Sequence, residues 1–75
     1  MPGSFADLLS SLPNDDGRAE VLRLAHEVRQ TQPESDAEQQ LLDKFVDRLR
    51  WHFRAARYAM PTHTQLRQMI DAHFR

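Results

Sequence analysis

Few side chains in this sequence have the types and spacing that catalysis requires. Asp43 and Asp47 stand four residues apart on one expected helix, a separation that places two carboxylates on the same face. Lys44 and Arg48 directly follow them, so each carboxylate has a cation within reach. Solvated ion pairs account for this pattern better than acid-base chemistry does. We therefore assign no catalytic role to the two aspartates.

The sequence also lacks the spacing of a metal or phosphate site. His52, His63 and His73 are separated by eleven and ten residues, whereas one helix presents two ligands only at separations of three or four. Gly3 and Gly17 are the only glycines, so no glycine-rich phosphate loop is present, and cysteine is absent. We expect no metal, no cofactor and no enzymatic activity.

Arginine and aromatic residues gather in the second half of the chain. Trp51 and Tyr58 are seven residues apart, which puts them on nearly the same side of a continuous helix, with Arg54 between them. Large rings beside arginines are enriched at binding hot spots. The alternative is that a short helix covers both rings. We predict a partner-binding surface made of Arg48, Arg50, Trp51, Arg54, Arg57, Tyr58 and Arg67.

The charge of the chain is divided between its two parts, although the formal net charge is only -1. Residues 1–47 hold ten acidic and four basic side chains, for a net charge of -6, whereas residues 48–75 hold six arginines and one aspartate, for a net charge of +5. This division favours either a basic surface that faces an anionic partner or acidic early helices that fold back onto basic later ones.

One long helix is expected to carry most of the predicted surface. Ser35 and Glu38 have the spacing of a capping box, and no Gly or Pro follows until Pro61, so the helix should span about residues 36–59. Apolar residues recur along it at steps of three and four: Leu42, Val46, Leu49, Phe53, Ala56 and Met60.

Shorter helices flank the long one on its N-terminal side. Ser4 and Asp7 have capping spacing at the start of a first helix, which ends before Pro13. Because it is so short, the segment 1–13 either docks by its apolar face or frays. A second helix should run from about Gly17 to Gln30.

A last short helix is expected after Pro61, which removes a backbone donor and breaks the long helix. Thr62 and Gln65 repeat the capping spacing, and the helix should end near His73. No alternating strand pattern is present. The sequence therefore predicts one all-α domain over residues 1–75, a small bundle of three to four helices built on the long helix.

The five residues from Arg57 to Pro61, with the sequence Arg-Tyr-Ala-Met-Pro, close the expected long helix. They are similar to a stretch of the theta subunit of bacterial DNA polymerase III, a small all-helical accessory protein. The similarity covers these five positions, and no function is inferred from it.

These features favour a small non-enzymatic regulatory or accessory protein of bacterial or phage type. We expect it to bind a larger protein, such as a polymerase or a nucleoprotein complex, and to inhibit or modulate transcription or other nucleic-acid machinery. Two alternatives stay open: a nucleic-acid-binding module, and a homodimer in which the long helices pair along their apolar stripe. No apolar run approaches the length of a membrane span and no secretory signal is evident, so a cytoplasmic location is expected.

Overall fold

The computed structural model describes residues 3–75, most of which lie in four α-helices. The helices are α1 (Phe5–Ser11), α2 (Asp15–Arg29), α3 (Asp36–His52) and α4 (His63–His73), and no strand occurs in the described part of the chain. The predicted all-α bundle is thereby confirmed. The first two residues of the segment predicted to dock or fray lie outside the described residues.

Local capping defines the starts of α1 and α4 as predicted. The hydroxyls of Ser4 and Thr62 each accept a hydrogen bond from the backbone N–H three residues later. The side chains of Asp7 and Gln65 return a bond to the backbone N–H of the capping residue, which completes both boxes. These contacts satisfy backbone groups that the first helical turn leaves without partners.

The box predicted at the start of α3 is only half formed. The Ser35 hydroxyl accepts from the Glu38 N–H at 3.1 Å, but the Glu38 carboxylate does not return to Ser35 and instead accepts from the Glu34 N–H at 3.0 Å. This leaves Glu38 almost fully buried at the junction between α2 and α3. The carboxylate then takes part in a tertiary ion pair, described below.

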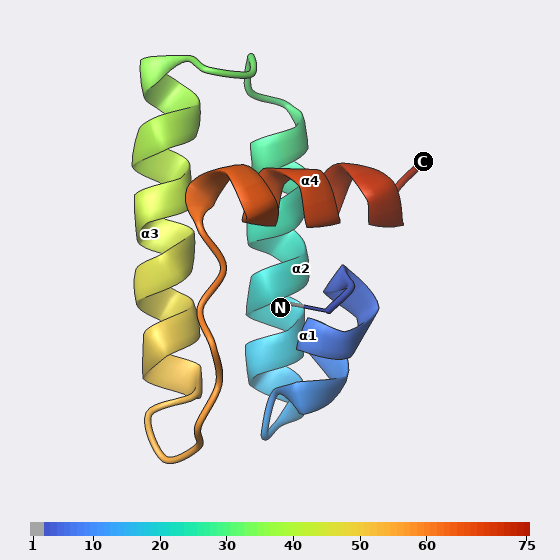
Figure 1. Cartoon of the computed structure of the whole chain (residues 1–75), viewed down its shortest axis with the longest axis vertical. Helices are drawn as coiled ribbons and strands as arrows, with labels where there is room; N and C mark the ends of the chain where they lie inside the picture. Colours follow the sequence, from blue (N-terminus) through green and yellow to red (C-terminus); the bar gives the residue numbers. More distant parts are fainter. Residues whose placement is uncertain (1–2) are drawn as a thin grey trace.

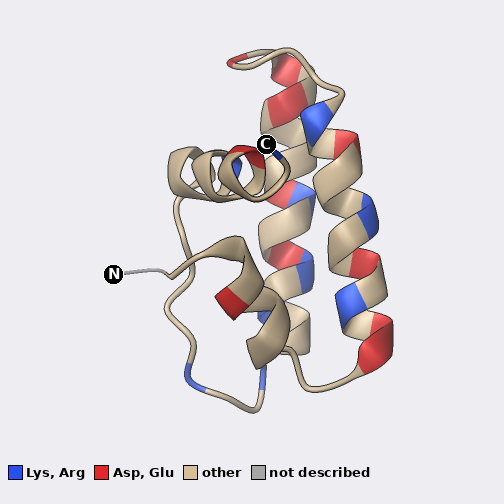
Figure 2. Cartoon of the chain, turned by 90° about the vertical axis from the view of Figure 1, so that its right-hand side faces the viewer, with Lys and Arg blue, Asp and Glu red and all other residues tan. Residues whose placement is uncertain are grey.

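The helices pack in two layers. α2 and α3 run side by side in opposite directions, and α4 crosses both of them (Figure 1). α1 packs against α4, and the view in Figure 2 shows α1, α4 and the segment before α4 on the same side of the α2 and α3 pair. All four helices contribute to one core, whose buried side chains are Phe5, Leu8, Leu12, Val21, Leu24, Ala25, Val28, Leu42, Phe45, Val46, Leu49, Phe53, Leu66 and Ile70.

Helix α3 ends at His52, so the prediction that it continues to about residue 59 is wrong. The chain turns back within residues 53–56 and then runs without regular structure to α4. Burial explains the early end: Phe53 lies in the core, the Tyr58 ring stacks on it, and Pro61 is buried. A continued helix would lead Tyr58 and Pro61 away from the bundle, and this loss of burial outweighs the intrinsic helix propensity of the segment.

The apolar stripe predicted along the long helix is used inside the chain. Its first four members, Leu42, Val46, Leu49 and Phe53, are all buried. Ala56 and Met60 follow the end of α3 and do not continue the stripe: Ala56 is exposed and Met60 is half-buried. Pairing of two chains along this stripe would therefore require the core to open.

Candidate binding surface at the end of helix α3

Arg48 lies at the contact between α2 and α3, where its partly exposed side chain forms an ion pair within the chain. Its Nε donates to Oε1 of Glu20 at 2.7 Å, and Nε2 of His52 lies 2.9 Å from the same oxygen. The hydrogen bonds from Arg48 and His52 hold the pKa of the Glu20 carboxyl below its ordinary value of 4.5. The sequence prediction placed Arg48 on a partner-facing surface, whereas the structure gives it an intramolecular partner.

The same contact explains the second glycine of the chain. A Cβ atom at Gly17 would lie 3.0 Å from Nδ1 and 3.2 Å from Cε1 of the His52 ring. α2 and α3 approach this closely because Gly17 has no side chain, and the His52 side chain is almost covered as a result. The first turn of α2 therefore packs directly against the last turn of α3.

Arg67 has an even more extensive set of internal partners. Its Nη1 lies 2.9 Å from Oε2 of Glu38 and donates to the Val28 carbonyl at 2.8 Å, while its Nε donates to Asp71 at 3.1 Å. The side chains of Arg67 and Glu38 are only 15% and 10% exposed. Arg67 thus joins α4 to the end of α2 and the start of α3, and its guanidinium is paired with carboxylates of the same chain.

Tyr58 does not share a helix face with Trp51, because it follows the end of α3. Its ring stacks on Phe53 with the centroids 4.3 Å apart and the planes 5° from parallel. Burial raises the pKa of the Tyr58 hydroxyl, and the charge of Asp7 on α1 raises it further. The prediction that Trp51 and Tyr58 lie on one side of a continuous helix is therefore wrong, and Tyr58 is a half-buried residue packed against the core.

Trp51 has the opposite environment. It is 51% exposed, and within residues 3–75 it is the one large hydrophobic side chain classed as exposed. The Arg54 guanidinium lies over its indole, 4.0 Å from the ring centroid. Nη1 of Arg54 also donates to the Trp51 carbonyl at 2.9 Å. The turn after α3 thus places an arginine on the ring by local contacts alone.

Two further arginines lie close in sequence to this pair. Arg50 is exposed and sits 3.6 Å from the Asp47 carboxylate, also exposed, so this ion pair is weak. Arg57 is exposed and forms no ion pair with another described residue. In Figure 2 the segment between α3 and α4 shows basic but no acidic positions. We call Arg50, Trp51, Arg54 and Arg57 the Trp51 surface.

Two further histidines contact residues on other helices. Nε2 of His63 lies 3.1 Å from Asp43, and its Nδ1 lies 2.9 Å from the Gln39 amide nitrogen, a contact between α3 and α4 that sequence spacing did not reveal. His73 packs against Phe5, with the ring centroids 5.2 Å apart. In the part of the chain that the structure describes, no three His, Asp or Glu side chains are grouped to hold a metal ion.

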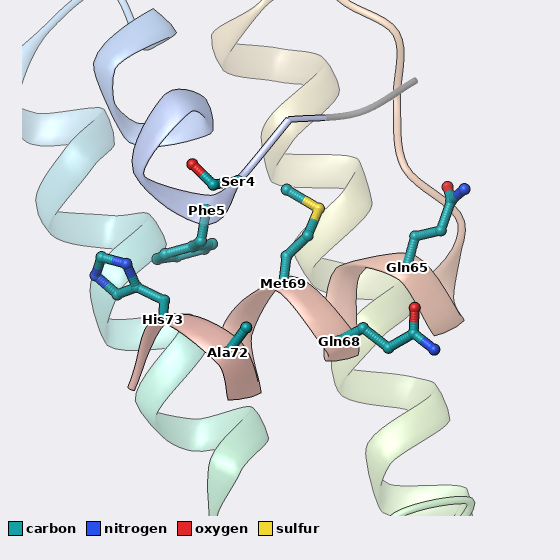
Figure 3. Close-up of a pocket in the computed structure, with 7 residues that line it drawn as sticks. All are labelled: Ser4, Phe5, Gln65, Gln68, Met69, Ala72 and His73. Atoms are coloured by element: carbon teal, nitrogen blue, oxygen red, sulfur yellow. The ribbon is translucent and has the colours of Figure 1, made fainter. Parts of the chain in front are cut away.

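A pocket of about 440 Å³ lies between α1 and α4, and no sequence pattern predicted it. Figure 3 shows Phe5 and Met69 beside it, with Gln65 and Gln68 towards the opposite end of α4 from His73. Ser4 and Ala72 complete its lining. The residues that form it are about sixty positions apart, so only the tertiary contact of the two helices creates it. His73 is the single titratable side chain of the lining.

Comparisons with models of known protein families, with curated proteins and with solved structures find no match. Within residues 3–75, no helix combines the length and the apolar character needed to cross a bilayer.

Proposed function

We propose that this protein is a small non-enzymatic binding protein that docks on a larger protein through the Trp51 surface. The observation that carries the proposal is the half-exposed indole of Trp51, held under the Arg54 guanidinium. With half of a side chain of roughly 250 Å² exposed, full burial of the indole against a partner is worth on the order of 3 kcal/mol. This is the size of contribution expected from an interface hot spot.

The geometry of the surface also lowers the entropy cost of binding. The stacking contact and the hydrogen bond to the Trp51 carbonyl fix the Arg54 side chain before any partner arrives. A side chain that is already ordered loses less freedom at an interface. The proposed binding surface is therefore smaller than the one predicted from the sequence. It excludes Arg48, Tyr58 and Arg67, and it consists of Arg50, Trp51, Arg54 and Arg57.

We also propose that the larger protein belongs to the nucleic-acid machinery and that binding regulates it. The reason is the arginine content of the Trp51 surface, which suits a protein that sits beside nucleic acid in a larger complex. A polymerase or another nucleoprotein complex of a bacterium or phage is the target we expect. The direction of the effect, inhibition or activation, is left to experiment.

A pull-down from an extract of the source organism tests the docking function. The double variant Trp51→Ala with Arg54→Glu should lose the partner that the wild-type protein captures. Arg23→Glu, which changes an exposed arginine on α2, serves as the matched control and should retain it. Circular dichroism must first show that both variants are folded. Equal capture by a folded double variant would remove the site assignment.

Direct nucleic-acid binding makes a different prediction. A chain that neutralises several phosphates loses affinity steeply between about 50 and 200 mM salt. Here Arg48 and Arg67 are paired internally, and acidic and basic positions both occur along α2 and α3 (Figure 2). We therefore expect no mobility shift of a duplex or single strand by the isolated protein at low salt, and a clear shift would favour the nucleic-acid alternative.

A further inference from the structure

The Arg54 guanidinium has one edge in use and another edge open. Nη1 donates to the Trp51 carbonyl at 2.9 Å, and the planar group lies over the indole. Nε and Nη2 form the neighbouring edge, and neither donates to a described residue. In arginine this edge presents two parallel N–H groups, the arrangement that binds a carboxylate with two hydrogen bonds.

No carboxylate of a described residue forms an ion pair at this edge. The sequence has no acidic residue between Asp47 and Asp71, and Asp47 faces Arg50. Asp15 on α2, the helix packed against the end of α3, is paired with Arg18. Among the described residues, neither Arg54 nor Arg57 has a carboxylate within ion-pair distance. The chain thus leaves this part of the Trp51 surface positively charged.

The geometry points to the chemistry of the group that this edge binds. This inference rests on the proposed docking function. We infer that the Nε and Nη2 edge of Arg54 binds the carboxylate of an Asp or Glu side chain on a protein partner, while an apolar side chain next to that carboxylate packs on the exposed part of the Trp51 indole. Arg57 adds attraction at longer range. The partner segment therefore presents acidic side chains next to an apolar one.

A carboxylate fits this surface better than a nucleic-acid backbone does. Phosphate tracking needs a row of unpaired cations, whereas Arg54 and Arg57 are the arginines of the predicted surface that have no ion pair among the described residues. Base stacking needs an open ring face, and the Arg54 guanidinium already covers one face of the indole. One carboxylate beside one apolar group uses both features that are present.

Trp51 provides the readout, because it is the only tryptophan in the sequence. The probe is a capped peptide of sequence Glu-Glu-Leu-Glu-Glu-Leu-Glu-Glu, titrated at about 150 mM salt, where exposed charges are largely screened. Indole fluorescence follows apolar contact, and the Nε–Hε cross-peak of Arg54 in NMR spectra follows the carboxylate. Both signals should change at the same peptide concentration. The same peptide with Gln in place of Glu, and a short oligothymidylate, are titrated in parallel.

Arg54→Lys separates two-pronged binding from simple charge attraction. It keeps the positive charge but loses the planar edge, so the acidic peptide should bind about tenfold more weakly, the cost of one charge-assisted hydrogen bond. Arg23→Lys makes the same chemical change on the exposed surface of α2 and should leave affinity unchanged. Circular dichroism of both variants controls for folding.

Each result decides the inference. Tenfold weakening by Arg54→Lys with no effect of Arg23→Lys supports it. Equal binding by Arg54→Lys, equal binding of the Gln peptide, or tighter binding of the oligothymidylate overturns it. Absence of acidic-peptide binding also overturns it. Suppose that the acidic peptide does not bind but the variant Trp51→Ala with Arg54→Glu still loses its partner in the pull-down. The carboxylate ligand is then rejected, whereas the proposed docking function is retained.

Discussion

Substitution of Arg67 separates two roles for this residue. The sequence predicted that Arg67 binds a partner, whereas in the structure its side chain connects three helices by hydrogen bonds and ion pairs. The variant is Arg67→Met, which keeps most of the side-chain length and removes the charge. Glu38 would then be left as a carboxylate that is 10% exposed and without its partner 2.9 Å away. The Val28 carbonyl would lose one of its donors as well, and would keep the N–H and hydroxyl of Thr31.

The expected loss follows from this burial. Removing one member of a buried ion pair costs about 3 to 5 kcal/mol, and the residual exposure of both side chains places this pair near 3. At about 0.05 to 0.15 kcal/mol per residue, a chain of this length has a total stability of roughly 4 to 11 kcal/mol. Arg67→Met should therefore remove a large part of it and lower Tm by about 12 to 24 °C.

Urea unfolding followed by circular dichroism measures the free energy, and a second variant keeps the test selective. Glu38→Gln removes the charge that Arg67→Met leaves unpaired, so the double variant should be more stable than Arg67→Met alone by about 1 to 2 kcal/mol. A loss below about 1 kcal/mol for Arg67→Met, or no recovery in the double variant, would refute the structural role. Arg67 would then return to the set of candidate surface residues.

Three other predictions follow from contacts at the two ends of the bundle. The pKa of Glu20 is lowered in the folded state, so the ionised carboxylate stabilises the fold. This contribution is fully present above the ordinary pKa of 4.5 and is lost as the pH falls through the lower pKa of the folded state. The difference in unfolding free energy between wild type and Glu20→Gln should therefore shrink over that pH range. Gly17→Ala should fail to gain the roughly 1 kcal/mol that alanine offers in a helix, because its Cβ would press on His52, and the gain should appear in a His52→Ala background. Phe5→Ala should cost about 3 kcal/mol or more in urea unfolding and should speed amide hydrogen exchange in α1 more than in α2, since Phe5 is buried and α1 has only seven residues.

Each of these has a clear contrary result. A constant difference between wild type and Glu20→Gln at every pH would mean that Arg48 and His52 do not stabilise the ionised carboxylate. Equal effects of Gly17→Ala in the two backgrounds would separate the glycine from the histidine ring. Uniform exchange across α1 and α2 in Phe5→Ala would show that α1 opens only with the whole bundle.

Most helix starts could be predicted from the sequence, since the groups that set them are local. A capping side chain and the N–H that it satisfies are three residues apart, as at Ser4, Ser35 and Thr62. The inner face of each helix was visible for the same reason, because apolar residues at steps of three and four share one side. The all-α class and the apolar stripe from Leu42 to Phe53 follow from these two local rules.

The end of α3 and the residues that make up the Trp51 surface could not be predicted in this way. Nothing between residues 36 and 61 breaks a helix locally, and α3 stops at His52 because Phe53 and Tyr58 gain burial by turning back. That early end removed Tyr58 from the predicted face and placed Arg54 on the Trp51 ring. Patterns of residues three or four positions apart do not predict where tertiary burial ends a helix.

The sequence by itself determined the charge division and the presence of four helices. Only the tertiary structure decided which arginines form an ion pair within the fold and which do not. Arg48 pairs with Glu20 across 28 positions and Arg67 with Glu38 across 29, and both pairs join the acidic part of the chain to the basic part. The alternative in which acidic helices fold onto basic ones thus holds for these two residues. Arg54, in the turn after α3, has no carboxylate of residues 3–75 within ion-pair distance. Pairing depends on distance in space, and the packing of α2, α3 and α4 sets that distance.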